Sequence, residues 1–597
     1  MTKNRNIHIW MIGCACLLGL SSCNDSFLNK FPETSITEGG FFTSPKDLEI
    51  YTNGMYGYIT SNYTDAVSDN NISTSDAYIY KMMKGNVDPN NTGTWSWSSI
   101  RNVNFMLARC NKIQGDMAEA NHYIGLARMM RAKLYYDKVL SYSDVPWYSR
   151  DLQTNDKELL YKPQDSRKVV VDSIMKDLEF ATTNMKDGNS RTRWFKNGAL
   201  AIQARIALSE ASWRKYHPEL ELNDADRFYQ IAIDACSKII QSNQYSLSTA
   251  KSGLLDSYEA LFCSDDLSNN KEMIFYENYS KELKRYHNAG GALFDYDGSL
   301  SRDLMEDYLV IENNKTKTFQ EVPGYDKKEF VDVFENRDPR MKQTFMTPGF
   351  IKASETKPYR QKITLGGYPQ VKFYPRTADQ IPWGNAYTDL PVIRYAEILL
   401  MYAEAKAELG QLTQDDIDKT INEIRRRAGV PDASLTEWMS KIDPTQEKHY
   451  PNVSSSQKGA VLEIRRERRI ELACEGFRFN DLMRWGCGKK MAEVPEGIYI
   501  GKLGYMDVTG DGQPDYAIVA TKEDANAIPA EDKKNYNLQV EILAGNTIAL
   551  TEENKGFIQM ISQIGRWTFE DPKYYYTPLA TKDLIYNPNL VQNKYWK

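Results

Sequence analysis

The chain has 597 residues, of which 41% are hydrophobic and 26% are charged. This is the composition of an ordinary globular protein, and the length suffices for one large domain or several smaller ones. The formal net charge is −6. It argues against nucleic acid and anionic lipid headgroups as the main ligand, because both are bound by clusters of Lys and Arg.

The N-terminus has the pattern of an export signal. Lys3 and Arg5 form a short basic start, and residues 7–20 form an apolar run. A run of this length suits a signal peptide and is too short to span a bilayer as a helix. Cys23 follows Leu-Ser-Ser, which resembles a bacterial lipobox. We therefore predict that residues 1–22 are removed and that lipid on Cys23 tethers the chain to a membrane. An ordinary secretion signal with an incidental cysteine is the alternative.

Helical periodicity dominates residues 23–250. Ser44, Pro45 and Asp47 are typical of a capping box that opens a helix. Apolar residues then recur at helical spacing in Ser96–Ile113, Met117–Ser141, Ser166–Met185, Asn197–Trp213 and Asp224–Gln241. Alanines in these stretches permit close helix packing. This favours tetratricopeptide-like helix pairs, although a regular repeat of about 34 residues is absent.

Residues 251–390 are predicted to be a variable, loop-rich region. Gly, Pro, Asn and Asp become frequent there, and Met273–Tyr276 is strand-like. Helical patterns return in residues 391–597, at Ile393–Ala405 with Gly410 as its stop, at Ile417–Ala428, and at Lys458–Glu475. The prediction is a mainly α fold of helix pairs with a loop-rich insertion.

Four glutamates lie one helical turn apart at Glu463, Glu467, Glu471 and Glu475, with arginines between them. Like charges at this spacing repel, so the row needs cationic partners. A structural ion network between stacked helices is the favoured interpretation, and a catalytic carboxylate pair is the alternative. The chain has five histidines and no HExxH, GxSxG or phosphate-loop motif, so nothing else in it favours an enzyme.

A short acidic segment has features of a calcium loop. Oxygen-bearing side chains stand at relative positions 1, 3, 5 and 9, with a glycine at position 6. The candidate ligands are Asp507, Thr509, Asp511, Gln513 and Asp515. Position 12 is Ile518 rather than glutamate, which excludes a full EF-hand. Calcium binding and an ordinary Asp/Gly turn are both open interpretations.

Several stretches resemble the SusD/RagB family of outer-membrane lipoproteins from Bacteroidetes, and they follow one another in family order. They are Asp25–Leu28, Ala127–Pro146, Asn336–Arg340, Ile393–Gly410, Ile421–Gly429, Glu463–Trp485 and Asn587–Trp596. Ser143 and Tyr595 stand where the family usually has glycine. The resemblance extends over essentially the whole chain after the signal peptide.

The resemblance implies a fold on four tetratricopeptide-like helix pairs with a loop-rich region packed against them. It also implies a cell-surface lipoprotein that acts as the lid of a SusC-like TonB-dependent transporter. Such a protein captures oligosaccharide or polysaccharide and passes it to the transporter, with no catalysis and no required cofactor. A peptide-binding relative and a mainly structural lid are the alternatives. A surface hydrolase would need a carboxylate pair in residues 250–390.

Aromatic residues are the candidate glycan contacts, because a flat apolar face with a polar edge suits sugar rings. In relatives, the segment around the start of the Ser96–Ile113 helix often contributes a stacking aromatic and an amide. Trp95 and Trp97 lie there, and Trp95 is the better candidate because Trp97 falls near a structural position of the family. Tyr78, Tyr296 and Trp383 lie in other segments that commonly form the binding face. Partial burial is the alternative role for each of them.

Overall fold

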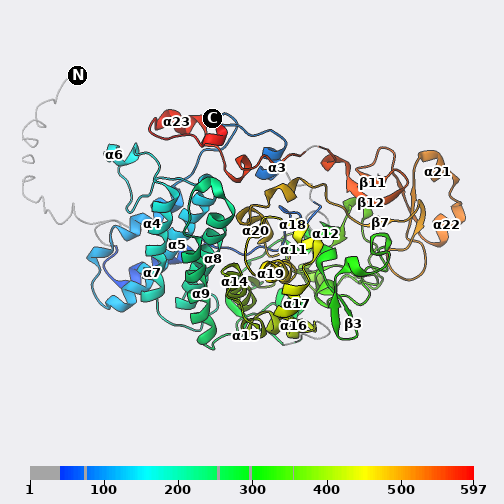
Figure 1. The fold of residues 1–597 in the computed structure, drawn as a ribbon, viewed down its shortest axis with the longest axis horizontal. Coiled ribbons are helices and arrows are strands. Elements are labelled where there is room, and N and C mark those ends of the chain that lie inside the picture. The colour runs from blue at the N-terminus through cyan, green and yellow to red at the C-terminus, as the bar shows by residue number, and fades with distance from the viewer. Residues whose placement is uncertain are drawn as a thin grey trace, which may run out of the picture.

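Helices gather at one end of the molecule, and short strands and loops gather at the other (Figure 1). The structure, a computed structural model, describes residues 41–72, 77–249, 251, 256–294, 299–353, 355–565 and 567–597. The signal sequence, Cys23 and Tyr296 lie outside these residues, and what the sequence predicts for them stays a prediction. Within the described residues, no helix combines the length and the apolar character that crossing a membrane requires.

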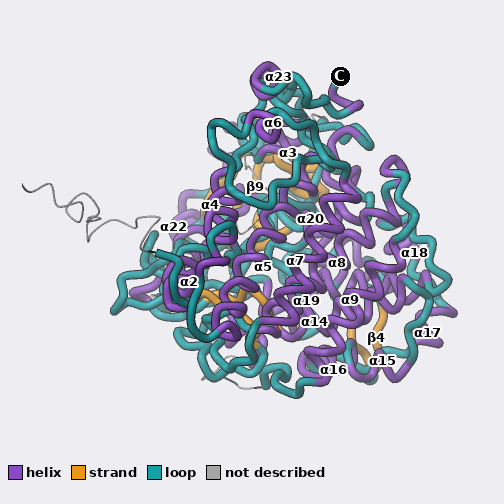
Figure 2. The backbone as a smooth tube through the Cα atoms, turned by 90° about the vertical axis from the view of Figure 1, so that its left-hand side faces the viewer, coloured by secondary structure: helices purple, strands orange, loops and turns teal. Residues whose placement is uncertain are grey.

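The N-terminal part is built from helix pairs. Its helices are α2 (Pro45–Asn53), α3 (Tyr78–Met83), α4 (Ser98–Leu107), α5 (Met117–Tyr142), α6 (Lys157–Leu160), α7 (Arg167–Asn184), α8 (Lys196–Tyr216) and α9 (Ala225–Gln241). The predicted cap of α2 is confirmed, because the Ser44 side chain accepts the Asp47 N–H and the Asp47 carboxylate accepts the Ser44 N–H. Helix α5 packs against α7, and α8 packs against α9 (Figure 2).

Small residues bring these helices together. Five alanines of α8 are buried, as the sequence pattern predicts: Ala199, Ala201, Ala204, Ala207 and Ala211. The helical part then meets the next region through aromatic stacking. The ring of Trp194, just before α8, stacks on Phe275 with 3.9 Å between centroids.

The middle region is loop-rich, as predicted. Its elements are α10 (Ser257–Phe262), β1 (Met273–Glu277), α11 (Ala289–Ala292), β2 (Ser299–Leu300), α12 (Arg302–Asp307), β3 (Val310–Glu312), β4 (Lys315–Lys317), α13 (Arg340–Thr344) and β5 (Tyr368–Pro369).

The C-terminal region begins with helices and ends in small sheets. It contains β6 (Leu390–Arg394), α14 (Tyr395–Glu408), α15 (Gln414–Lys419), α16 (Ile421–Ala428), α17 (Leu435–Ser440), α18 (Pro444–His449), α19 (Lys458–Glu471) and α20 (Arg478–Arg484). The remaining elements are β7 (Tyr499–Ile500), β8 (Gly504–Met506), β9 (Tyr516–Val519), α21 (Lys522–Ala527), α22 (Ala530–Asn535), β10 (Gln539–Ile542), β11 (Ile548–Glu552), β12 (Lys555–Met560) and α23 (Thr581–Tyr586). Strands β8, β9 and β10 form one sheet, and β7, β12 and β11 form another.

Four predicted helices have wrong boundaries. The helix predicted over Ser96–Ile113 is α4, which ends already at Leu107. Ile393 and Arg394 belong to strand β6, which pairs antiparallel with the distant β1, so helix α14 begins only at Tyr395. A fully buried strand has the same continuous apolar pattern as a buried helix, and periodicity cannot separate the two. The predicted helix at 417–428 is broken at Thr420 into α15 and α16. Helix α19 ends at Glu471, and Cys474 has a positive φ of 66°.

The three glutamates on α19, together with Glu475 just beyond its end, form the predicted ion network. Its cationic partners come from five segments: Arg340, Lys372, Arg394, Arg425, Arg427 and Arg466. Glu471 is fully buried and accepts from Arg394 at 2.6 Å and from Arg340 at 2.9 Å, while Arg427 forms a third pair with it. Burial alone would raise the pKa of Glu471, but the three guanidinium groups outweigh it and hold that pKa well below its usual range. These carboxylates join helices together.

Candidate functional site

A cavity of about 290 Å³ opens where three distant segments meet. It is walled by the segment before α4, by residues 146–152 and α6, and by α23 near the C-terminus. Helices α6 and α23 lie close together above α4 (Figure 1). Two side-chain amides join their flanking loops, because Asn587 donates to the Lys162 carbonyl at 3.0 Å and Asn589 donates to the Tyr161 carbonyl at 2.6 Å.

Aromatic rings form one wall of this cavity. The ring of Trp95 meets that of Trp97 edge to face, with 5.3 Å between centroids, and Trp97 meets Tyr148 in the same way at 5.4 Å. Tyr142 contacts Trp95 from behind, again edge to face, at 5.4 Å. Perpendicular contacts of this kind are favourable and fix the orientation of each ring. Tyr586, which is 65% exposed, adds an aromatic side chain at the mouth.

Polar groups around the cavity fall into two classes. Asn104 and Asp151 are buried and engaged in the fold, Asn104 with the Tyr148 carbonyl at 2.8 Å and Asp151 with Arg109 at 3.2 Å. Asp583 and Arg101 lie at the rim. The Asp583 carboxylate accepts the backbone N–H of Trp95 at 3.3 Å, and partial burial raises its pKa.

A lysine lies over the aromatic wall. The Lys138 ammonium is 4.5 Å from the centroid of Trp97. Burial lowers the pKa of Lys138 to about 8, although Asp137 and Asp583 favour its charged form. The aromatic wall therefore carries a cation–π contact with Lys138, whose charged form is disfavoured by burial.

The profile of the SusD family matches residues 259–596 of this chain. The chain belongs to the SusD family. The SusD-like protein P38 of Formosa agariphila is 24% identical over 515 residues, which cover 81% of this chain and 92% of that protein. The SusD-like protein P25 of the same organism is 22% identical over 542 residues, covering 81% of this chain and 90% of that protein.

Solved structures show the same fold. A SusD-like carbohydrate-binding protein of Bacteroides fragilis has a TM-score of 0.65 and 20% identity, with 92% of this chain and all of that chain covered. A second SusD-like protein of that species has a TM-score of 0.65, 19% identity, and covers 95% of this chain and 100% of its own. The predicted family and the mainly α, SusD-like fold are thus confirmed.

The structure of this SusD family member brings two of the predicted ligand-binding residues together. Trp95 and Trp97 both line the cavity. Tyr78 does not line it, and its hydroxyl lies 2.6 Å from the Thr92 hydroxyl in the segment before Trp95. Whether these side chains contact a ligand stays a prediction.

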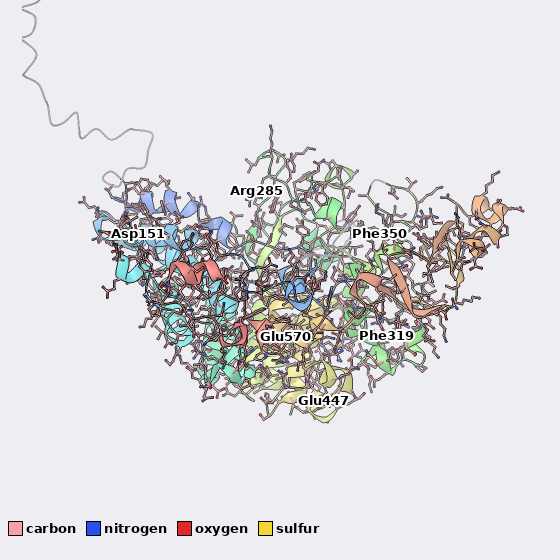
Figure 3. The ribbon with its side chains drawn as sticks, turned by 90° about the horizontal axis from the view of Figure 1, so that it is seen from above. Asp151, Arg285, Phe319, Phe350, Glu447 and Glu570 are labelled. Carbon is pink, nitrogen blue, oxygen red and sulfur yellow. The ribbon has the colours of Figure 1, made fainter. Side chains whose placement is uncertain are left out.

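Trp383 lies at a different place from the cavity. It is 59% exposed and belongs to a loop that packs on α11, where a Cβ on Gly291 would come within 3.0 Å of the Trp383 ring. Tyr286 precedes α11 in the chain. Its ring contacts that of Tyr387, which belongs to the same loop as Trp383, with 6.5 Å between centroids. Figure 3 shows Asp151, from the cavity wall, well apart from Arg285, the neighbour of Tyr286.

Several cavity residues were not found from the sequence. Tyr148, Leu160, Asp583 and Tyr586 come from irregular segments or from helices of six residues or fewer, where periodicity carries little information. The sequence signal closest to them was the terminal motif at Asn587–Trp596, which follows α23 directly. That motif indicates membership of the family. It does not indicate that this segment packs against the N-terminal helices.

The predicted calcium loop is a network of turns in the structure. The Asp507 carboxylate accepts the backbone N–H groups of Gly510 at 2.6 Å and Gly512 at 2.8 Å. The Asp515 carboxylate accepts those of Val508 and Thr509 at 2.9 and 2.8 Å. Asp511 likewise accepts the Gln513 N–H at 2.8 Å. Among the residues that the structure describes, no group of three or more His, Cys, Asp or Glu side chains is arranged to hold a metal ion.

A calcium titration tests this loop. Because its carboxylates already hold the turns through backbone N–H groups, we expect the melting temperature and the tryptophan fluorescence to be the same in EDTA and in millimolar calcium. A saturable rise in melting temperature that is lost in Asp507→Asn would instead establish the calcium site, since a ligand that binds only the folded state stabilises it.

Proposed function

We propose that this SusD family member binds oligosaccharide or polysaccharide at the cavity walled by Trp95, Trp97 and Tyr148. Sugar rings have apolar C–H faces surrounded by hydroxyl groups, and aromatic faces bordered by polar groups complement both. The observation that carries the proposal is this aromatic wall, with Asp583 and Arg101 at its rim. A solved relative with the same fold is described as carbohydrate-binding.

The proposal extends to uptake. The resemblance to SusD/RagB proteins supports a lid that delivers glycan to a SusC-like TonB-dependent transporter in the outer membrane. The lipobox-like pattern at Cys23 supports a lipid anchor, and the resemblance to SusD/RagB proteins supports a position on the cell surface. We propose binding without catalysis. The occupation of the glutamate row in the ion network around α19 supports this, because that row is one of the carboxylate pairs considered from the sequence.

A binding screen tests the glycan proposal. The chain without its lipid anchor, beginning just after Cys23, is run through native gels that contain plant, host or microbial polysaccharides. We expect one class of polysaccharide to retard it, and soluble oligosaccharides of that class to relieve the retardation. If none of the polysaccharides retards the chain, the proposal is contradicted. Peptides or a purely structural lid would then be the functions to test.

A further inference from the structure

The cavity proposed to bind glycan has a largely apolar lining. Ile100 and Leu590 are buried in it, and Leu160 at its mouth is 39% exposed. Pro146 and Leu152 add further apolar surface. An apolar cavity of roughly 150 Å³ is enough to hold benzene. The volume of about 290 Å³ therefore has room for a substituted phenyl ring.

Three polar side chains of the lining are already engaged in the fold. Asn104 donates to the Tyr148 carbonyl at 2.8 Å, and its side-chain oxygen accepts as well. Each carboxylate oxygen of Asp151 accepts a hydrogen bond, and so does the side-chain oxygen of Asn587, whose nitrogen donates. A sugar ring carries a hydroxyl group on most of its carbons, and each hydroxyl that is buried without a partner is costly. An apolar group makes no such demand on this lining.

Polar groups that are not engaged in this way lie at the mouth. Arg101 is exposed, and among the described residues no hydrogen bond or ion pair joins its guanidinium to another side chain. One oxygen of the Asp583 carboxylate accepts the Trp95 N–H at 3.3 Å, which leaves the other oxygen for a ligand. Sugar hydroxyl groups both donate and accept, so they match a carboxylate together with a guanidinium. The sugar ring is therefore expected at the mouth, on the face of Trp95.

The aromatic wall continues from Trp95 to Trp97. The ring of Trp97 contacts that of Tyr135, which is fully buried, with 6.1 Å between centroids, and that of Tyr148 at 5.4 Å. Aromatic rings gain from edge-to-face and offset contacts beyond the area that they bury. A group that enters the cavity meets Trp97 and Tyr148, and this favours an aromatic group over an aliphatic one.

We propose that the glycan bound here carries an aromatic acyl ester, such as a hydroxycinnamoyl group. Its ring lies against Trp97 and Ile100, and the sugar that bears the ester stays at the mouth with Asp583 and Arg101. The ester is uncharged, so it enters an apolar cavity without the cost of burying a charge. This inference rests on the proposed glycan function and narrows its substrate class to acylated glycans.

Methyl ferulate and methyl acetate test the acyl group by itself, with ligand-observed NMR on the chain that begins just after Cys23. Both probes are neutral esters, and only methyl ferulate has an aromatic ring. We expect methyl ferulate to bind at least about tenfold more tightly, because its ring buries apolar surface in the cavity. If methyl ferulate does not bind, or binds no better than methyl acetate, the inference is overturned.

Saponification tests the ester in its glycan. Plant cell-wall polysaccharides are compared in native gels before and after mild alkali, which removes acyl esters and leaves the backbone. We expect the affinity measured from retardation to fall at least about tenfold after saponification. Equal retardation by both forms would overturn the inference and leave the proposed glycan function standing. If no polysaccharide retards the chain while methyl ferulate binds, the glycan function on which the inference rests is overturned, and the cavity is a pocket for a free aromatic ester.

Two variants place the ester in the cavity. Leu160 is partly exposed at the mouth, so Leu160→Asp is expected to keep the fold. It introduces a charge that an aromatic ring would have to desolvate, and we expect methyl ferulate to bind at least about tenfold more weakly. Leu283→Asp makes the same change at a side chain that is 72% exposed and does not line the cavity, and is expected to leave the affinity unchanged. Methyl ferulate that binds Leu160→Asp as tightly as the wild type would place the ester elsewhere and refute the assignment.

Discussion

Replacing Glu471 by glutamine is expected to lower the free energy of unfolding by about 3–5 kcal/mol. The carboxylate is fully buried and is shared by Arg340, Arg394 and Arg427. Glutamine has nearly the same shape but no charge, so each of the three guanidinium groups would lose one of its carboxylate partners while staying buried. The remaining partners are Asp338 and Glu467 for Arg340, Glu272 and Glu475 for Arg394, and Glu272 for Arg427. Removing one partner of a buried ion pair is far more costly than the net worth of the pair, because the remaining charge cannot return to water.

Urea unfolding followed by circular dichroism and by tryptophan fluorescence measures this loss. The matched control is Lys419→Met, which removes a pair with Asp415 whose side chains are 69% and 70% exposed. An exposed pair contributes at most about 1 kcal/mol, so the control is expected to change little. If Glu471→Gln is no more destabilising than Lys419→Met, the network of α19 does not hold the helices together as described.

The same carboxylate predicts the direction of the pH dependence. The pKa of Glu471 is held below that of the unfolded chain, so its stabilising contribution is complete above the unfolded value of about 4.3 and is lost as the pH falls below it. The wild type is therefore expected to lose stability on acidification. Glu471→Gln, which cannot titrate at this position, is expected to lose less over the same range.

Replacing Trp95 by alanine is expected to weaken glycan binding at least about tenfold, or about 1.4 kcal/mol. The indole forms the wall of the cavity together with Trp97, and its edge-to-face contacts with Trp97 and Tyr142 set its orientation. Alanine removes the apolar face against which a sugar ring would stack. Trp95→Phe keeps a smaller aromatic face and is expected to retain part of the affinity.

Calorimetry with the glycan identified in the polysaccharide screen measures this effect, and the melting temperature reports on the fold. Tyr505→Ala is the control. Tyr505 is an exposed aromatic residue on β8 that contacts Asp532 and does not line the cavity at Trp95. Trp95→Ala with unchanged glycan affinity would exclude the cavity as the glycan site. Loss of the fold together with loss of binding would assign Trp95 to the core. Trp383→Ala, measured in the same way, shows whether the glycan also reaches the separate loop at α11.

The sequence by itself determined the local structure and the family. Helical periodicity found α5, α7, α8, α9 and α19, because each has a buried face that recurs every turn. Repulsion within the glutamate row of α19 required cationic partners, and the structure supplies them. The family motifs are local patterns as well, so the sequence shows them without any knowledge of the fold. The lipobox-like pattern at Cys23 is equally local and stays a prediction.

The tertiary structure alone decided which distant segments meet. Arg340 and Arg394 lie far from Glu471 in sequence, yet they supply its counter-charges. Ile393 and Arg394 have a pattern that predicts the start of a helix. They belong instead to strand β6, because its partner β1 comes from another region of the chain. The cavity at Trp95 is completed by Tyr586 from the other end of the chain. Periodicity reports only whether a side chain is buried. What the side chain is buried against depends on how the helices and loops pack. The cavity at Trp95 is a product of that packing.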